Sequence, residues 1–236
     1  MIWPILLVTL GLGALLAYWE LILAEGAHLG PRVVVWTYDL AAARYDRIKK
    51  FDLPTEADLI GLPLTAALAE VPAPRVLDVA AGTGRTARAL LPQVAFDGAV
   101  VSLDLSARMI RVGREQCAAW PGRVDWVHAP ADPLPFADGS FNAVTCLEAL
   151  EFFPLARAAV AELVRVLRPG GLLLLTNRVG WEAWLLPGKT FSRAAFGQLL
   201  TEFPLEAVRV EPWQVGYDLA WARKRALGPE GFRKVF

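Results

Sequence analysis

The chain has 236 residues, which suits one domain of ordinary size with a short appendage. Lysine plus arginine and aspartate plus glutamate are balanced at 24 each, so the chain has no broad basic field for nucleic acid. Two cysteines, Cys117 and Cys146, are too few for a disulfide framework, and we expect both to be reduced and buried. These features argue against a charge-driven nucleic-acid partner and favour a reducing, cytoplasmic environment.

The N-terminal segment has no charged residue between Ile2 and Trp19. As an α-helix this run spans roughly 27 Å, and its apolar continuation exceeds the roughly 30 Å of a hydrocarbon core. Tyr18 and Trp19 stand where an aromatic belt would lie, and Glu20 follows at the level of the headgroups. We therefore predict a single-pass transmembrane anchor over residues 1–26.

Three alternatives remain open for this segment: a buried core helix, a helix lying in the membrane interface, and a cleaved signal peptide. An interfacial helix would carry a charged face, which this segment lacks. Ala24-Glu25-Gly26 is a weak cleavage site, but no basic residue precedes the apolar run, which is also longer than a usual signal. The basic residues nearby all follow the helix, so they favour a cytoplasmic catalytic domain: Arg32, Arg44, Arg47, Lys49 and Lys50.

Residues 27–74 are expected to form a helical linker or lid. Residues 28–31 contain Gly and Pro and are expected to interrupt the helix. Apolar residues then recur with a helical period, so that four side chains share an apolar face: Val33, Trp36, Leu40 and Ile48. Thr55, with Asp58 three residues later, predicts a helix start after Pro54. These helices either simply cover a sheet or also form a lid over a cofactor and face the membrane.

Residues 75–236 alternate between predicted strands and helices, which indicates an α/β domain with a parallel sheet covered on both faces. The expected strands are Arg75–Ala80, Ala99–Leu103, Arg123–His128, Phe141–Leu147 and Gly171–Thr176. The expected helices are Thr86–Leu91, Ala156–Leu167 and Ser192–Leu200. A final pair of strands, Glu206–Trp213 and Gly216–Arg223, is joined by a short turn.

A ligand site is indicated where the first strand ends. Gly82 and Gly84 let the backbone turn tightly and approach a ligand, and the following helix offers free N–H groups. Asp104 ends the second strand about 20 residues later, where a carboxylate suits a ribose diol. This pattern alone also occurs in dinucleotide-binding domains.

Four stretches between Arg75 and Asn177 resemble, in order, the motifs of class I S-adenosylmethionine-dependent methyltransferases of the small-molecule, lipid and quinone-biosynthesis type. They are Val76–Gly84, Asp104–Ile110, Leu134–Phe141 and Leu167–Gly171. The resemblance implies a Rossmann-like, mostly parallel sheet of seven strands that ends in an antiparallel hairpin. It also implies S-adenosylmethionine as the cofactor and an apolar or membrane-associated small-molecule acceptor, such as a quinone, a lipid, or a lipophilic thiol or phenol.

The same resemblance implies which residues contact the cofactor. Gly82 and Gly84 would line its methionine and ribose, Asp78 would orient the turn or meet the amino group, and Asp104 would accept the ribose hydroxyls. Leu105 and Leu134 would flank the adenine or pack in the core. The expected cofactor-binding set is Asp78, Ala80, Gly82, Gly84, Asp104, Leu105 and Asp132.

Several positions depart from the family pattern or have no assigned role. Ala80 replaces the first glycine of the turn, and three further departures bear on the adenine and the substrate: Pro130, Asn142 and Phe152. Asp132 is either an adenine contact or an exposed loop acid. Other residues are weaker candidates: His128 as a base, Tyr45 as a lid residue, and Trp181, Trp184 and Trp213 as pocket lining or core. No catalytic residue and no metal site is predicted.

Two other functions compete with a membrane-anchored methyltransferase. An NAD(P)-dependent oxidoreductase can share the glycine turn, and a catalytically silent anchored scaffold can keep the fold. The acceptor atom and the oligomeric state are not determined by the sequence.

Overall fold

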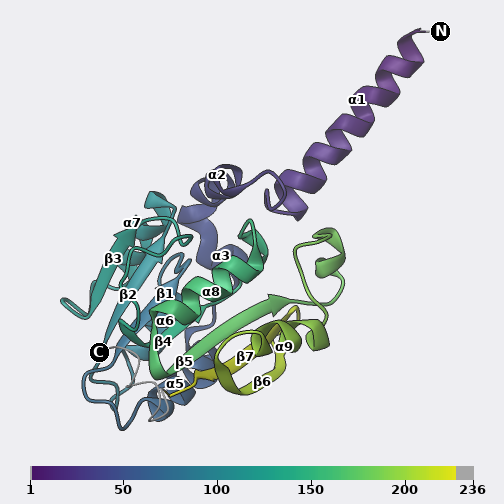
Figure 1. The fold of residues 1–236 in the computed structure, drawn as a ribbon. Helices are drawn as coiled ribbons and strands as arrows, with labels where there is room; N and C mark the ends of the chain where they lie inside the picture. The colour runs from purple at the N-terminus through teal and green to yellow at the C-terminus, as the bar shows by residue number, and fades with distance from the viewer. Residues whose placement is uncertain (1, 227–236) are drawn as a thin grey trace.

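The computed structural model describes residues 2–226, and a seven-stranded sheet forms its centre (Figure 1). Residues 227–236, the end of the predicted catalytic domain, lie outside the described residues, as does Met1. The strands are β1 (Arg75–Val79), β2 (Ala99–Asp104), β3 (Val124–His128), β4 (Phe141–Cys146), β5 (Leu167–Arg178), β6 (Leu205–Trp213) and β7 (Tyr217–Lys224). They are ordered β3-β2-β1-β4-β5-β7-β6, and only β7 runs antiparallel to both neighbours. The predicted mostly parallel sheet with a terminal antiparallel hairpin is therefore confirmed.

Alternating side chains bury both faces of the sheet. In β5, Leu173 and Leu175 join the core under α8 (Ala156–Val166) and α9 (Arg193–Thr201), whereas Leu172 and Leu174 pack toward α5 (Leu62–Ala67) and α6 (Arg85–Leu90). This strand extends beyond the predicted Gly171–Thr176 because β4 pairs with it at Leu167 and β7 pairs with it at Arg178. Both cysteines are free and buried, as expected.

The helix predicted to start at Thr55 begins earlier, with α4 (Leu53–Glu56). Asp52 has an extended backbone and precedes the helix, and its carboxylate accepts a 2.6 Å hydrogen bond from the Thr55 hydroxyl. Thr55 therefore lies inside the first turn instead of capping it. A π-helical turn, Ala57–Gly61, connects α4 to α5.

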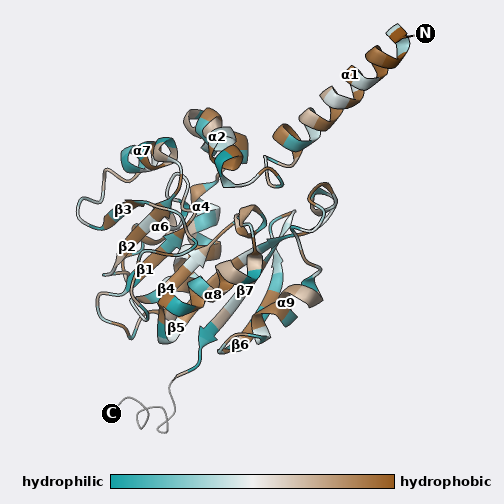
Figure 2. Cartoon of the chain, turned by 45° about the horizontal axis from the view of Figure 1, so that its top comes forward, coloured by the Kyte–Doolittle hydropathy of each residue, from teal (hydrophilic) through white to brown (hydrophobic). Residues whose placement is uncertain are grey.

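The N-terminal helix α1 (Ile2–Tyr18) continues into a π-helical turn, Trp19–Leu23, and projects away from the domain (Figure 1). None of the α1 side chains is buried, and Figure 2 shows mostly apolar colouring along it. Within the described residues, this is the one helix long and apolar enough to cross a membrane. The buried-core alternative is therefore excluded for this segment.

The base of this helix is docked onto the domain. Ala24 and Ala27 are buried against Leu186, and the Trp19 indole donates a 3.1 Å hydrogen bond to the Leu185 carbonyl. Glu20 accepts hydrogen bonds from the backbone N–H and the Nδ1 atom of His28, at 3.0 and 2.9 Å. Glu20, which we expected at headgroup level, is thus turned onto the protein and buried.

The expected apolar face of the lid segment is not the face that packs. This segment comprises α2 (Pro31–Ala41), a 3-10 turn (Ala42–Arg44) and α3 (Tyr45–Lys49). Of the predicted face, Trp36, Leu40 and Ile48 are exposed. The lid is rotated because Asp39 binds the Ser106 hydroxyl at 2.5 Å, at the start of α7 (Ala107–Gln116).

Candidate functional site

The turn after β1 is shaped by two glycines with positive φ. Gly82 has a φ of +55° and Gly84 a φ of +86°. A side chain at Gly84 would also meet the Trp126 ring, at 3.0 Å from an added Cβ. The turn closes through a 2.8 Å hydrogen bond from the Gly84 N–H to the Ala81 carbonyl, and α6 begins directly afterwards. The sequence therefore needs glycine here for both conformation and space.

Ala80 also adopts a left-handed conformation, with a φ of +55°, although it carries a Cβ. This costs on the order of 1 kcal/mol. We expect Ala80→Gly to raise the free energy of unfolding by up to about 1 kcal/mol, less the extra unfolded-state entropy of glycine. Ala81→Gly is the matched control, because Ala81 has no positive φ, and it should lower stability. Urea denaturation measures the free energy of unfolding of wild type and of both variants. Equal losses of stability in the two variants would contradict the argument that Ala80 is strained.

Asp104 connects this turn to the end of β2. Its Oδ2 atom accepts a 2.8 Å hydrogen bond from the Gly82 N–H, and its Oδ1 atom accepts one of 2.8 Å from the Ser106 N–H. Each carboxylate oxygen can accept a further hydrogen bond, so ligand hydroxyls can still bind. Burial raises the pKa of Asp104. Asp104 therefore both shapes the turn and lines the cavity described below.

Asp78 is the buried carboxylate beside the turn. Its Oδ1 atom accepts hydrogen bonds from the hydroxyls of Thr86 and Thr145, at 2.9 and 2.7 Å. Its Oδ2 atom is buried and has no hydrogen-bond partner among the described residues. Burial raises the pKa of this carboxyl to about 6. An unpaired buried acceptor is costly, so this oxygen suits a ligand that brings a donor.

A cavity of about 210 Å³ lies at the carboxyl ends of β1, β2 and β4. The lid helix α2 covers it with Val34, Val35 and Tyr38. The opposite walls comprise Ala80, Gly82, Leu103–Ser106, Ala129–Asp132, Leu147–Ala149 and Phe152–Pro154. A smaller cavity beside it is lined by Asp78, Gly82 and Arg85, among others. Apolar walls with a few convergent carboxylates suit a small ligand with a flat ring, hydroxyls and an amino group.

The lid is latched to the turn through one carboxylate. Asp46 Oδ1 accepts a 2.6 Å hydrogen bond from the Thr83 hydroxyl, and its Oδ2 atom pairs with Arg88 at 2.6 Å. Tyr45 lines the cavity, and its ring would lie 3.6 Å from a Cβ added at Gly82. Asp46 was not among the residues identified from the sequence. The adjacent Tyr45, flagged there as a lid residue, was the available signal.

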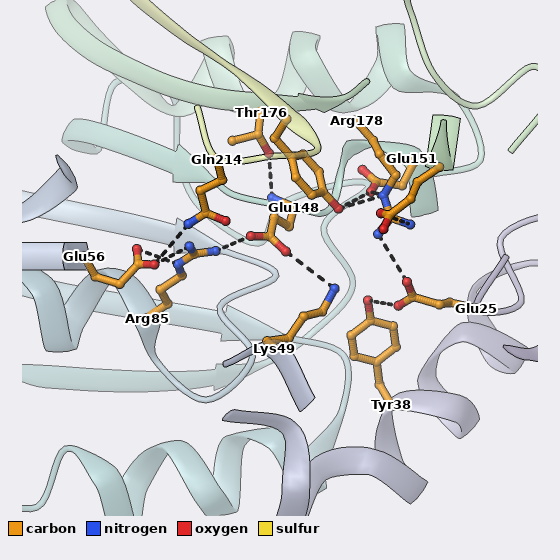
Figure 3. A network of polar contacts seen from close by, with 12 residues as sticks. Glu25, Tyr38, Lys49, Glu56, Arg85, Glu148, Glu151, Thr176, Arg178 and Gln214 are labelled. Atoms are coloured by element: carbon orange, nitrogen blue, oxygen red, sulfur yellow. Dashed lines mark hydrogen bonds and ion pairs between the residues drawn. The ribbon is translucent and has the colours of Figure 1, made fainter. Parts of the chain in front are cut away.

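A network of buried ion pairs extends from Glu148, on the wall of the cavity, into the protein (Figure 3). Arg85 pairs with Glu56 and with Glu148, each at 2.5 Å, and Lys49 lies 3.5 Å from the other Glu148 oxygen. Arg178 pairs with Glu151 at 2.9 Å. Sequence reasoning missed this network, because its members come from separate elements and share no motif.

The structure places most, but not all, of the predicted site residues on the walls of these two cavities. Those lining the main cavity are Ala80, Gly82, Asp104, Leu105 and Asp132, whereas Asp78 lines the smaller one. Gly84 lies behind the turn, against Trp126. Leu134 is buried in the core and does not line either cavity, because its backbone N–H is held by Glu162 at 2.7 Å.

The weaker candidates also separate. His128 is exposed, and its Nε2 atom lies 2.9 Å from the Leu105 carbonyl, so it does not face the cavity as a base. Trp213 is buried and stacks with Arg85, whereas Trp181 and Trp184 are exposed. Phe152, a departure from the family pattern, lines the main cavity.

Comparison with known proteins agrees with this geometry. A family model described as a methyltransferase domain matches residues 76–171. A demethylmenaquinone methyltransferase from Renibacterium salmoninarum is 32% identical over 181 residues, which cover 74% of this chain and 68% of the relative. A demethylmenaquinone methyltransferase from Clavibacter sepedonicus is 40% identical over 145 residues, which cover 61% of this chain and 58% of the relative. This chain thus spans only about three fifths to two thirds of these relatives.

Among solved structures, a SAM-dependent methyltransferase from Aquifex aeolicus matches with a TM-score of 0.57 and 18% identity. The match covers 74% of this chain and 99% of that one, and it supports the fold. The strand order, the glycine turn, the acid at the end of β2 and the sequence relatives agree. The chain therefore belongs to the class I S-adenosylmethionine-dependent methyltransferases.

Proposed function

We propose that this protein transfers a methyl group from S-adenosylmethionine to an apolar, membrane-associated acceptor of the quinol type. The observation that carries the proposal is the cavity in which the Gly82 turn and Asp104 meet, beside the unpaired Oδ2 atom of Asp78. The names of the relatives, demethylmenaquinone methyltransferases, support the acceptor class.

The residues present fit the cofactor. The unpaired oxygen of Asp78 would accept from its amino group, and Asp104 would accept from its ribose hydroxyls while holding Gly82. Leu105 and Pro130 offer apolar contact to the adenine, and Asp132 is an exposed acid on the same wall. Gly84 supports the turn from behind.

The cofactor supplies a methyl group on a positively charged sulfur, which is already a good leaving group. The main contribution of this chain is therefore position and the exclusion of bulk water. A quinol also loses one proton when it gains the methyl group, and a carboxylate on the cavity wall can accept that proton. Tyr38 and Phe152 line the cavity and contact each other edge-on, with ring centroids 5.6 Å apart. Together with Tyr45 they cover the site on the lid side.

The oxidoreductase alternative is disfavoured because β7 runs antiparallel, whereas a dinucleotide domain would continue with parallel units. Calorimetry on the full chain in detergent tests the proposal. We expect binding of S-adenosylmethionine and S-adenosylhomocysteine and none of NAD. Preferential binding of NAD would refute it. Binding without methyl transfer to any demethylated quinol would instead support the silent scaffold.

Cofactor affinity should depend on the protonation of Asp78. Its pKa is about 6 without ligand, so below that pH a proton occupies the carboxyl and the affinity should fall by up to about tenfold per pH unit. The folding stability of the unliganded protein should change with pH in the opposite direction to cofactor affinity. A raised carboxyl pKa makes the folded state bind more protons, so stability is lost as pH rises through about 6. Calorimetric titrations across this range test the assignment, with Asp78→Asn, which removes this titrating carboxyl, as the control. A profile as steep in Asp78→Asn as in wild type, or a flat profile in wild type, would contradict it.

We further propose that α1 anchors the protein in a membrane with the catalytic domain on the cytoplasmic side. Its apolar length and lack of buried side chains support this. Deleting residues 2–18 should release the protein to the soluble fraction and leave cofactor affinity unchanged, because the docked residues from Trp19 onward remain. Turnover should fall only on a bilayer-embedded acceptor. Recovery of the full chain in a carbonate-wash supernatant, or a mature N-terminus near Ala27, would contradict the anchor.

A further inference from the structure

A second cavity, of about 660 Å³, lies between the base of the N-terminal helix, the lid and the ends of β5 and β7. This volume is within the range of small-molecule sites and is larger than that of the cofactor cavity. Residues from separate segments line it, including Leu21 near the start of the described chain and Tyr217 near its end. Some residues line this second cavity but not the cofactor cavity, and none of them has a role in the proposed cofactor binding.

The rim of this cavity is apolar and exposed. Four exposed side chains from four separate segments line it: Ile22, Ile48, Trp181 and Val215. Single exposed apolar residues are ordinary, but several around one opening indicate an interaction site. Ile22 belongs to the last turn of the apolar N-terminal helix. In a protein anchored by this helix, the rim therefore lies at the surface of the bilayer.

The floor of the cavity is formed by buried polar side chains, and Figure 3 shows the contacts among them. It includes Glu148, Arg178 and Tyr217, with Lys49 beside them. Lys49 Nζ lies 3.5 Å from Glu148, and no other ion pair of Lys49 occurs among the described residues. An ammonium has three donors, so Lys49 can bind a further oxygen. An apolar rim over a polar floor suits an amphipathic ligand with hydroxyls at one end.

The second cavity adjoins the cofactor cavity. Tyr38, Tyr45 and Glu148 line both. Glu148 is held at this boundary by strained backbone, with a φ of +51°, and by a 2.6 Å hydrogen bond from its N–H to the Thr176 hydroxyl. Such strain in a non-glycine residue is typical of functional sites. A ring bound on the floor would thus lie directly beside the cofactor cavity, at the boundary that these shared side chains form.

We propose that this second cavity binds the ring of an amphipathic, membrane-dissolved quinol, which enters from the bilayer past Ile22 and Trp181. The ring hydroxyls reach Lys49 and Glu148, and the apolar chain stays at the rim. This inference rests on the proposed function and adds the acceptor site and its route of entry.

Filling the cavity tests the site. Ala41 lines the second cavity and not the first, whereas Ala43, two residues on, is exposed and lines neither. Prenylated 1,4-naphthohydroquinone is titrated anaerobically into the full chain in nanodiscs with S-adenosylhomocysteine bound. We expect Ala41→Trp to weaken binding of this probe by about tenfold or more, and Ala43→Trp to leave it unchanged.

Titration of S-adenosylhomocysteine into the same variants keeps the two proposals apart. Its affinity should match wild type in both. Normal affinity for S-adenosylhomocysteine with unchanged probe binding in Ala41→Trp would overturn the acceptor site alone. Failure of wild type to bind S-adenosylhomocysteine would instead overturn the proposed function.

Charging the rim tests the route. Val215→Asp should weaken binding of the vesicle-embedded prenylated probe by about fivefold and leave binding of the chain-free ring from water unchanged. Val94→Asp is the control, because Val94 is equally exposed but precedes β2, at the other end of the sheet. Equal effects of Val215→Asp on both probes, or no effect on either, would overturn entry from the bilayer.

Discussion

Replacing Arg178 by methionine is expected to lower the free energy of unfolding by about 3–5 kcal/mol, because it leaves buried carboxylates without their cation. Arg178 is 4% exposed and pairs with Glu151, which is 1% exposed, at 2.9 Å. It also lies 3.2 Å from Glu25, at the base of the N-terminal helix. Chemical denaturation of the full chain in detergent measures the loss.

The loss should depend on pH in a defined direction. Burial already raises the pKa of Glu151, and removing Arg178 raises it further. A carboxyl with a raised folded pKa destabilises as pH rises through that pKa, so the deficit should shrink on acidification. Adding Glu151→Gln should recover about half of it. Arg209→Met, in an exposed pair with Glu211, should change little, and an equal loss there would contradict the burial argument.

Asp104→Ala is expected to weaken cofactor binding by about 1.5–3 kcal/mol while the domain remains folded. Two effects combine, because the carboxylate faces the cavity and also accepts from the Gly82 N–H. Calorimetry with S-adenosylmethionine and with methylthioadenosine separates them. Equal losses indicate the ribose contact, whereas a greater loss for S-adenosylmethionine indicates a loosened turn on the methionine side.

Asp125→Ala provides the control for this prediction. Asp125 is an exposed acid on β3, next to β2, and it does not line the cavity. Its removal should leave both affinities unchanged. Unchanged affinities in Asp104→Ala as well would remove Asp104 from the site.

The parts of this protein that follow from local pattern were predictable. Short apolar runs separated by turns and helices marked the strands of the sheet, and the spacing from Gly82 to Asp104 placed both at one edge of it. Ser106 lies two residues after Asp104 and caps α7, because its hydroxyl accepts from the Met109 N–H at 3.0 Å. In each case the residues that interact are near in sequence or held in register by neighbouring parallel strands.

The parts that depend on distant partners were not predictable. The lid presents Val34 and Tyr38 inward because Asp39 and Asp46 bind elements far along the chain, and helical spacing alone favoured Trp36 and Leu40. Glu148 and Arg178 gave no sequence signal, because each lies at the end of a strand and finds its partners in other segments. Helical spacing shows that apolar residues share one face of a helix, but it does not show which face of that helix packs against the domain.

The docked base of α1 has a consequence for how the protein moves. The helix continues without a break into the turn in which Trp19 and Glu20 are fixed to the domain, so the angle between helix and sheet is set by the fold. A protein held in a bilayer by this helix can diffuse laterally and rotate about the membrane normal, but its domain cannot reorient freely relative to the membrane. The frequency of encounters with a membrane-dissolved acceptor then depends on the number of acceptor molecules per unit area of bilayer. Adding water around the membranes leaves this frequency unchanged.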